Sequence, residues 1–341
     1  MNNPKFIASI FKKFNRFINN LLEKNLNKLN IDNFKNLLIN NKIFLSIVAL
    51  IILFLSYLSF PNIYNKDEVA LKIKEKIKNK LNLEFNFQED LNYKFLPRPH
   101  FTTNNSSINF KEDKITEIKK LKFYISLENL FSLKNLKLNH VILEDANFNL
   151  NKNNSNFFYN LLDANLNDFK FEILNSNVFY RSLENEVLLI NNISNAKYYF
   201  DSKEIKNIFN ADNEIFNLPY SIKIFDDKIE KKIHSKINIE SLRLKIDNQT
   251  SYADKNYLGL SEINLINTKS LFEYQLKNNL FEFKFFDKLQ NPEFSYVGKF
   301  NFKPFYSSIT GNTNKLDLSS LFSSNAIIKE LLKTEIFNNK N

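Results

Sequence analysis

The sequence predicts a mainly β protein with one apolar helix near its N-terminus. Three observations carry this prediction. Residues 43–60 carry no charge, apolar and polar residues alternate in many short segments from residue 81 onward, and Asn, Asp, Ser and Lys fill the gaps between those segments. The chain has 341 residues, 43% of them hydrophobic, which is enough for a sizeable core.

The first element is a basic tail, residues 1–42, with eight Lys or Arg against two acids. Apolar residues recur at helical spacing from Ile7 to Leu22, and basic residues lie between them. This pattern is typical of an amphipathic helix on an anionic membrane surface. The basic residues expected at that surface are Lys12, Lys13, Arg16 and Lys24. The alternative is a helix that packs on a partner or on a second copy.

The second element, residues 43–62, is predicted to be a single transmembrane helix. Its 18 uncharged residues, 43–60, would span about 27 Å as a helix. Pro61 ends it, and 42 residues precede it, which argues against a cleaved signal peptide. The orientation stays open: the whole tail favours a cytoplasmic N-terminus, whereas six lysines in residues 63–80 weigh against an external C-terminal domain.

Residues 63–80 are predicted to form a short juxtamembrane helix. Asn65 can cap it, with Glu68 three residues further on. Val69, Ile73 and Ile77 form one apolar stripe at intervals of four residues.

Residues 81–316 are predicted to form a long antiparallel sheet, because strict alternation gives each strand one apolar face. The pattern is clearest in LNLEFNF at 81–87, LKFYISL at 121–127 and LFEFKFF at 280–286. The chain has three glycines, so the turns cannot depend on Asn-Gly, and asparagine is expected in the left-handed conformation instead. An Asn-rich stretch, 151–168, interrupts the alternation, and residues 317–341 are predicted to be a C-terminal amphipathic helical segment.

Composition excludes several function classes. The net charge of +10 comes mostly from residues 1–42 and 63–80, and arginine is scarce, so we expect no nucleic-acid partner. The chain has no cysteine and three distant histidines, so no metal site is expected. It contains no glycine-built phosphate loop and no GxSxG or HExxH motif. We therefore expect no catalytic residue, no cofactor and no enzyme activity.

The order of these elements resembles the N-terminal part of the AsmA family of bacterial inner-membrane-anchored envelope proteins. An anchor, a short helix and a strand pair precede a Pro-x-Pro element, here Pro97 and Pro99. A leucine-rich segment of the family type follows, carried by Leu130, Leu133, Leu136 and Leu138. YVGKFNFKPF at 296–305 also resembles the family, whose members usually continue into further β repeats, so this chain would be a truncated or minimal member.

The resemblance implies that the sheet curves into a U-shaped trough whose apolar inner face holds lipid tails. Alternation alone favours this trough no more than a closed sandwich core. The residues expected to contact lipid are Leu121, Phe123, Ile125, Leu127, Leu136, Leu138, Phe148, Leu150, Phe281, Phe283, Phe285, Phe300 and Phe302.

The expected function is that of a single-pass inner-membrane protein, mainly periplasmic, that binds or conducts phospholipids toward the outer membrane and supports its assembly. The membrane, phospholipid and possibly envelope-assembly proteins are its expected partners. The alternatives are a non-enzymatic envelope-assembly scaffold that carries no lipid and a membrane-tethered closed β-sandwich adhesion module.

Overall fold

The computed structural model describes residues 42–312, apart from positions 112, 129, 165, 183, 254–255, 267, 288–294 and 303. The predicted tail helix, with Lys12, Lys13, Arg16 and Lys24, lies outside the described residues, and so does the predicted C-terminal segment 317–341. The chain divides into two compact units, and the boundary between them along the sequence lies between Phe60 and Pro61.

The first unit contributes helix α3, Lys42–Ser59, which a 3₁₀ turn, η1 (Phe60–Ile63), follows. This confirms the predicted apolar helix. Residues Ser46–Ile63 are long and apolar enough to cross a membrane, by length and composition. Large apolar side chains lie exposed along this helix, with Leu50 66% and Leu53 71% accessible. The helix therefore has the surface of a segment that faces lipid or another apolar environment.

The second unit begins with helix α4, Lys66–Leu81. The side chain of Asn65 accepts hydrogen bonds from the backbone N–H groups of Asp67 and Glu68, at 2.9 and 3.2 Å, as an N-cap does. Val69, Ile73 and Ile77 are at most 1% exposed, so the predicted stripe is buried. The helix ends where Asn82 takes the left-handed conformation.

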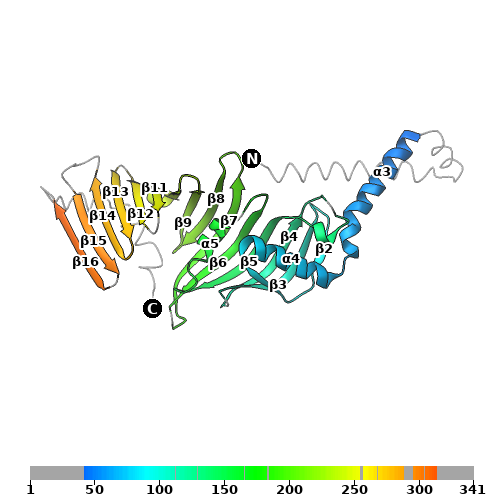
Figure 1. The fold of residues 1–341 in the computed structure, drawn as a ribbon, viewed down its shortest axis with the longest axis horizontal. Helices are drawn as coiled ribbons and strands as arrows, with labels where there is room; N and C mark the ends of the chain where they lie inside the picture. The colour runs from blue at the N-terminus through cyan, green and yellow to red at the C-terminus, as the bar shows by residue number, and fades with distance from the viewer. Residues whose placement is uncertain are drawn as a thin grey trace. The chain divides into compact units, whose positions relative to one another are not determined.

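The rest of the described unit is strand, interrupted by one helix and two 3₁₀ turns (Figure 1). The first eight strands are β1 (Glu84–Phe87), β2 (Asn92–Lys94), β3 (His100–Phe110), β4 (Asp113–Ile125), β5 (Leu138–Leu150), β6 (Lys170–Arg181), β7 (Val187–Asp201) and β8 (Lys206–Ile215). The last eight are β9 (Leu218–Asp227), β10 (Lys232–Ile239), β11 (Leu244–Ala253), β12 (Asn256–Leu265), β13 (Thr268–Lys277), β14 (Leu280–Asp287), β15 (Ser295–Phe302) and β16 (Phe305–Asn312). The remaining elements are α5 (Phe157–Asp163), η2 (Leu133–Asn135) and η3 (Glu240–Leu242).

All sixteen strands belong to one open sheet, in which β3 to β16 follow one another in chain order, and β1 and β2 both pair with β3. A closed sandwich of two sheets is therefore not the architecture of the described residues. The prediction of an antiparallel sheet is wrong at one position, because β5 and β6 are parallel. Parallel neighbours need a long crossover, and the Asn-rich residues 151–169, which contain α5, provide it.

Asparagine replaces glycine in the turns, as the sequence predicts. Among the described residues no glycine has a positive φ angle, whereas six asparagines do. Phe216 and Asn217, the two residues between β8 and β9, have φ angles of 50° and 60°. Two positive φ values are typical of the type I′ turn, whose twist matches that of the flanking strands.

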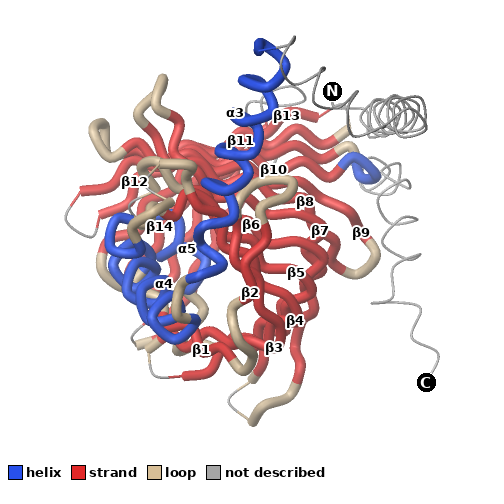
Figure 2. Tube along the Cα trace, turned by 90° about the vertical axis from the view of Figure 1, so that its right-hand side faces the viewer, coloured by secondary structure: helices blue, strands red, loops and turns tan. Residues whose placement is uncertain are grey.

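The hydrophobic core lies between the two helices and one face of strands β1 to β8. Phe157 of α5 packs edge-on against Phe110 and lies 5.7 Å, ring to ring, from Phe148. On the same face, Lys74 of α4 lies over the ring of Phe87. Figure 2 shows both helices on one side of these strands. Because both helices lie at this half of the sheet, they leave the strands after β8 without a helical cover among the described residues.

Candidate functional site: the apolar face of the sheet

The strand register gathers alternate side chains on one face, which we call the apolar face. One row of directly paired residues crosses the sheet from β3 to β16. Its members are Phe101, Phe123, Val141, Phe171, Tyr198, Phe209, Ile224, Ser235, Asn248, Ser261, Phe272, Phe285, Tyr296 and Gly311. Paired residues point to the same side of a sheet, so these residues form one continuous strip.

A second row lies beside the first and is entirely aliphatic. Its members are Leu121, Leu143, Ile173, Ala196, Ala211, Ile222, Ile237, Ile246 and Ile263. The apolar character of this face therefore continues from β4 to β12 without a charged residue in either row.

The first row is interrupted by polar residues in β10 to β12, and these residues satisfy one another. The amide oxygen of Asn248 accepts hydrogen bonds from Ser261 and Tyr274, at 2.7 and 3.0 Å. Its amide nitrogen donates to Ser235 and Thr250, at 3.3 and 3.0 Å. The Asn248 amide thus uses both donors and both acceptor positions internally. The cluster offers little hydrogen bonding to a ligand and interrupts the apolar face less than its composition suggests.

Burial divides the apolar face into two parts. Under α4 and α5 it is closed, and Leu121, Phe123 and Phe148 are all fully buried. From β9 onward the same face becomes half-exposed, as at Ile224 and Ile246. The physical reason is the position of the helices, because apolar side chains continue on this face beyond β8 but no described helix covers them there.

The half-exposed part ends in a cluster that we call the aromatic patch, formed by β13, β14 and β15. Its members are Phe272, Tyr274, Phe281, Phe283, Phe285, Tyr296 and Phe300. Phe283 stacks on Phe272 at 5.3 Å and on Phe300 at 5.9 Å, measured between ring centroids. All seven side chains are half-exposed, so the patch is a preassembled aromatic surface and not a filled core.

All three glycines of the chain lie opposite an aromatic residue at this end of the sheet. Gly259 pairs with Tyr274, Gly298 with Phe283, and Gly311 with Tyr296. At Gly298 a Cβ atom would lie 2.0 Å from a Phe283 ring atom, and at Gly259 it would lie 1.9 Å from the Tyr274 ring. Each aromatic ring therefore lies flat against the backbone of a neighbouring strand, which only glycine permits.

The structure divides the residues predicted to contact lipid into three groups. Those buried in the closed core are Leu121, Phe123, Ile125, Leu136, Leu138, Phe148 and Leu150. Those in the half-exposed aromatic patch are Phe281, Phe283, Phe285 and Phe300. Leu127 lies after the end of β4 and is 49% exposed, and Phe302 is 54% exposed. The predicted set is therefore not one accessible strip in this structure.

The lipid-contact set predicted from the sequence omitted Phe272, Tyr274 and Tyr296, although all three belong to alternating segments. The signal that distinguishes them is their cross-strand neighbours, two of which are glycines. The predicted lipid-contact set also omitted the isoleucines of β9 to β12, such as Ile224 and Ile246, which lie on the half-exposed part of the apolar face.

The opposite, polar face carries a ladder of rings and charges across β3 to β7. His100, Tyr124 and His140 stack, with ring centroids 4.9 and 5.3 Å apart. His140 Nε2 lies 2.9 Å from Glu172 Oε2, and Lys197 Nζ lies 3.2 Å from the other carboxylate oxygen. All of these except Lys197 are at most 8% exposed, so the ladder is largely closed to solvent and links neighbouring strands.

Burial and neighbouring charges together explain the protonation states of this ladder. Burial lowers the pKa of His100 and of His140, and the hydrogen bond from His140 to Glu172 opposes the change only in part. Burial alone would raise the pKa of Glu172, but the bond with His140 and the charges of Lys170 and Lys197 lower the pKa to about 2. Both histidines are therefore neutral and Glu172 is ionised near pH 7.

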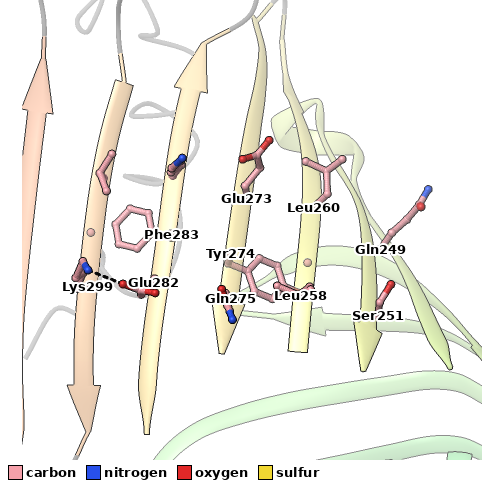
Figure 3. Close-up of a pocket in the computed structure, with 14 residues that line it drawn as sticks. Gln249, Ser251, Leu258, Leu260, Glu273, Tyr274, Gln275, Glu282, Phe283 and Lys299 are labelled. Carbon is pink, nitrogen blue, oxygen red and sulfur yellow. Dashed lines mark ion pairs between the residues drawn. The ribbon is translucent and has the colours of Figure 1, made fainter. Parts of the chain in front are cut away.

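A groove of about 670 Å³ crosses the polar face at β11 to β15 (Figure 3). Leu258, Leu260 and Val297 line it beside charged side chains, and Lys299 forms an ion pair of 2.6 Å with Glu282. Among the described residues no cluster of three His, Asp or Glu side chains could hold a metal ion. The groove shows no set of convergent acid, base and nucleophile, so the apolar face is the stronger candidate site.

No protein-family model and no curated protein matches this chain.

We predict that Gly298→Ala destabilises the protein by about 1–3 kcal/mol, because the new methyl group collides with the Phe283 ring. In a Phe283→Ala background the sign should reverse, since glycine within a strand is about 0.5–1 kcal/mol less stable than alanine. Urea unfolding of the four variants in a double-mutant cycle measures this. If Gly298→Ala lowers the free energy of unfolding equally with Phe283 and with Ala at position 283, the packing of the Phe283 ring flat against Gly298 is contradicted.

We also predict that acid lowers the melting temperature in two stages. The histidines bind fewer protons when folded, so stability should fall as pH drops below about 6.5. Glu172 should add a further loss between about pH 4.5 and 2, because its folded pKa is depressed. Thermal melts across pH test both stages. Glu172→Gln should shrink the lower stage, whereas Glu117→Gln, at an exposed pair, should leave it unchanged.

Proposed function

We propose that this chain is a membrane-anchored, non-catalytic protein that holds phospholipid acyl chains on the exposed part of its apolar face, β9 to β16, and so conducts lipid away from the membrane. The observation that carries the proposal is the aromatic patch, which is half-exposed although it belongs to a face that forms a closed core elsewhere. A soluble protein would normally cover such a surface.

The chemistry of the strip suits acyl chains. Each methylene that leaves water contributes about 0.8 kcal/mol, so a smooth apolar track can hold a chain without specific contacts. The three glycines keep the aromatic rings flat against the strands, and the Asn248 cluster has its hydrogen bonds satisfied. A lipid tail that lies along the two rows from β9 to β12 would therefore meet no charged side chain, and the polar cluster in its path has its hydrogen bonds satisfied, while the headgroup stays in water.

The apolar helix α3 supports the proposed membrane anchoring, since a membrane-spanning helix would keep the sheet next to a source of lipid. The resemblance of the element order to AsmA proteins extends the proposal to a curved, U-shaped trough, to an inner-membrane location with the sheet in the periplasm, and to a role in supplying the outer membrane. Lipid contact is confined here to the strands after β8, because the earlier strands bury the same face under α4 and α5.

Photocrosslinking tests lipid contact directly. A photoreactive phenylalanine analogue at Phe283 or Phe300 of the full chain in membranes should give phospholipid adducts by mass spectrometry. The same analogue at Phe123, which is fully buried on the same face, is the matched control and should give none. The absence of adducts at both exposed positions, with the protein folded, would exclude lipid as the occupant.

Substitution by aspartate separates the two parts of the face. Phe123→Asp would bury an unpaired charge and should cost several kcal/mol, enough to unfold the domain. Phe283→Asp leaves the carboxylate partly hydrated, so the melting transition should survive while lipid adducts at Phe300 decrease several-fold. Unfolding of both variants would indicate that the aromatic patch is core in solution.

Membrane orientation has its own test. A reporter fused after Asn341 that is active only outside the cytoplasm should be active, because the proposed function requires the sheet on that side. Activity of a cytoplasm-only reporter at the same fusion point would reject the periplasmic location without affecting the lipid-binding result.

A further inference from the structure

The two ends of the sheet differ in how their edges are protected. The first edge consists of β1 and β2, which have four and three residues, and each carries a charge, Glu84 or Lys94. Short strands and charges are the usual means by which proteins prevent one sheet edge from pairing with another. This first edge is therefore protected.

The second edge, β16, has none of these protections. It has eight residues, Phe305–Asn312, and neither a charge nor a proline. Among the described strands only β3 also lacks Asp, Glu, Lys and Arg, and β3 is paired on both sides. No described residue pairs with the outer edge of β16.

The side chains of β16 are also unusually exposed for their type. Phe305 is 75%, Tyr306 60% and Ile309 58% accessible. An uncharged, aromatic strand with a free row of backbone N–H and C=O groups is a template for another strand. The edge therefore has the features of an interface.

We propose that β16 pairs with β16 of a second copy of this chain, antiparallel and about a two-fold axis at Ser308, so that two sheets join into one. A strand without charge can face its own copy without like-charge repulsion. A head-to-tail contact is disfavoured, because the other edge offers only β1 and β2, which are short and charged. With the axis at Ser308, the two-fold contact uses the same seven residues, 305–311, on both sides.

The register follows from the glycine pattern. A two-fold axis at Ser308 pairs Phe305 of one copy with Gly311 of the other, and Tyr306 with Thr310. This repeats across the interface the pairing of an aromatic residue with a glycine that occurs three times within the sheet. An axis one residue further, at Ile309, would instead pair Gly311 with Ser307, so the pairing of an aromatic residue with this glycine would be lost.

Such an axis is perpendicular to the sheet, so it brings the apolar faces of the two copies to the same side. The aromatic patches of both copies would then lie on either side of the interface. This inference does not require that the apolar face binds lipid.

The chain contains no cysteine, which makes a single introduced cysteine an unambiguous reporter. Ser308→Cys in the full chain, in native membranes, should give a disulfide-linked dimer on oxidation. Thr310→Cys should give several-fold less, because two copies of residue 310 would be separated by about four residues of strand, roughly 13 Å. Ser202→Cys, in an exposed turn, measures random collision.

Ser308→Lys should abolish association of two differently tagged copies, because it places two like charges at the axis, whereas Ser308→Thr should preserve it. A melting transition for each variant checks that the sheet remains folded. Four results would each overturn the proposed pairing. Two concern the yield of disulfide-linked dimer: a yield from Ser308→Cys no higher than from Ser202→Cys, or a higher yield from Thr310→Cys. The others are crosslinking of Ser308→Cys to another protein, and association that Ser308→Lys leaves unaffected. None of these readouts depends on lipid, so this test and the lipid-binding test fail separately.

Discussion

The constraint on which this structure depends is that a single sheet with one apolar face must cover that face. Period-two alternation places Phe, Ile and Leu on the same side of strand after strand. In a sandwich a second sheet would cover them, but here all described strands belong to one sheet. Two helices cover the part formed by β1 to β8, where large side chains such as Phe123 and Phe171 reach full burial. The remainder of the face has no helical cover among the described residues.

The uncovered part differs from the core in how its side chains are supported. In the core, side chains of α4 and α5 pack against the aromatic rings of the strands, as Phe157 packs against Phe110. In the aromatic patch the rings are held from within the sheet, by stacking on one another and by lying over glycine. The patch is therefore preorganised without a covering element, which is the property that a surface for mobile acyl chains requires.

The polar face serves a different purpose. Its ion pairs and ring stacks run from strand to strand, as in the ladder from His100 to Glu172, and they add cross-strand contacts without closing a pocket around a reactive group. One face of the sheet thus carries ion pairs and stacked rings, and the other carries continuous rows of apolar side chains. A long sheet built in this way can remain a single layer with its polar face toward water.

Local patterns in the sequence determined helix α3, helix α4 with its cap at Asn65 and its buried stripe, the use of asparagine in left-handed turns, and the alternation of the strands with the clearest patterns. These features depend on neighbours a few residues apart. The alternation did not predict strands such as β3 and β12, because apolar and polar residues alternate only weakly in HFTTNNSSINF and NYLGLSEINL.

Only the tertiary structure decided which part of the apolar face is buried, that β5 and β6 run parallel, and that the chain's three glycines lie beneath aromatic rings. Phe123 and Phe283 belong to equally regular alternating segments, yet one is fully buried and the other half-exposed. The difference comes from where α4 and α5 pack and from the register between strands. Both are contacts between distant parts of the chain, which no local pattern encodes.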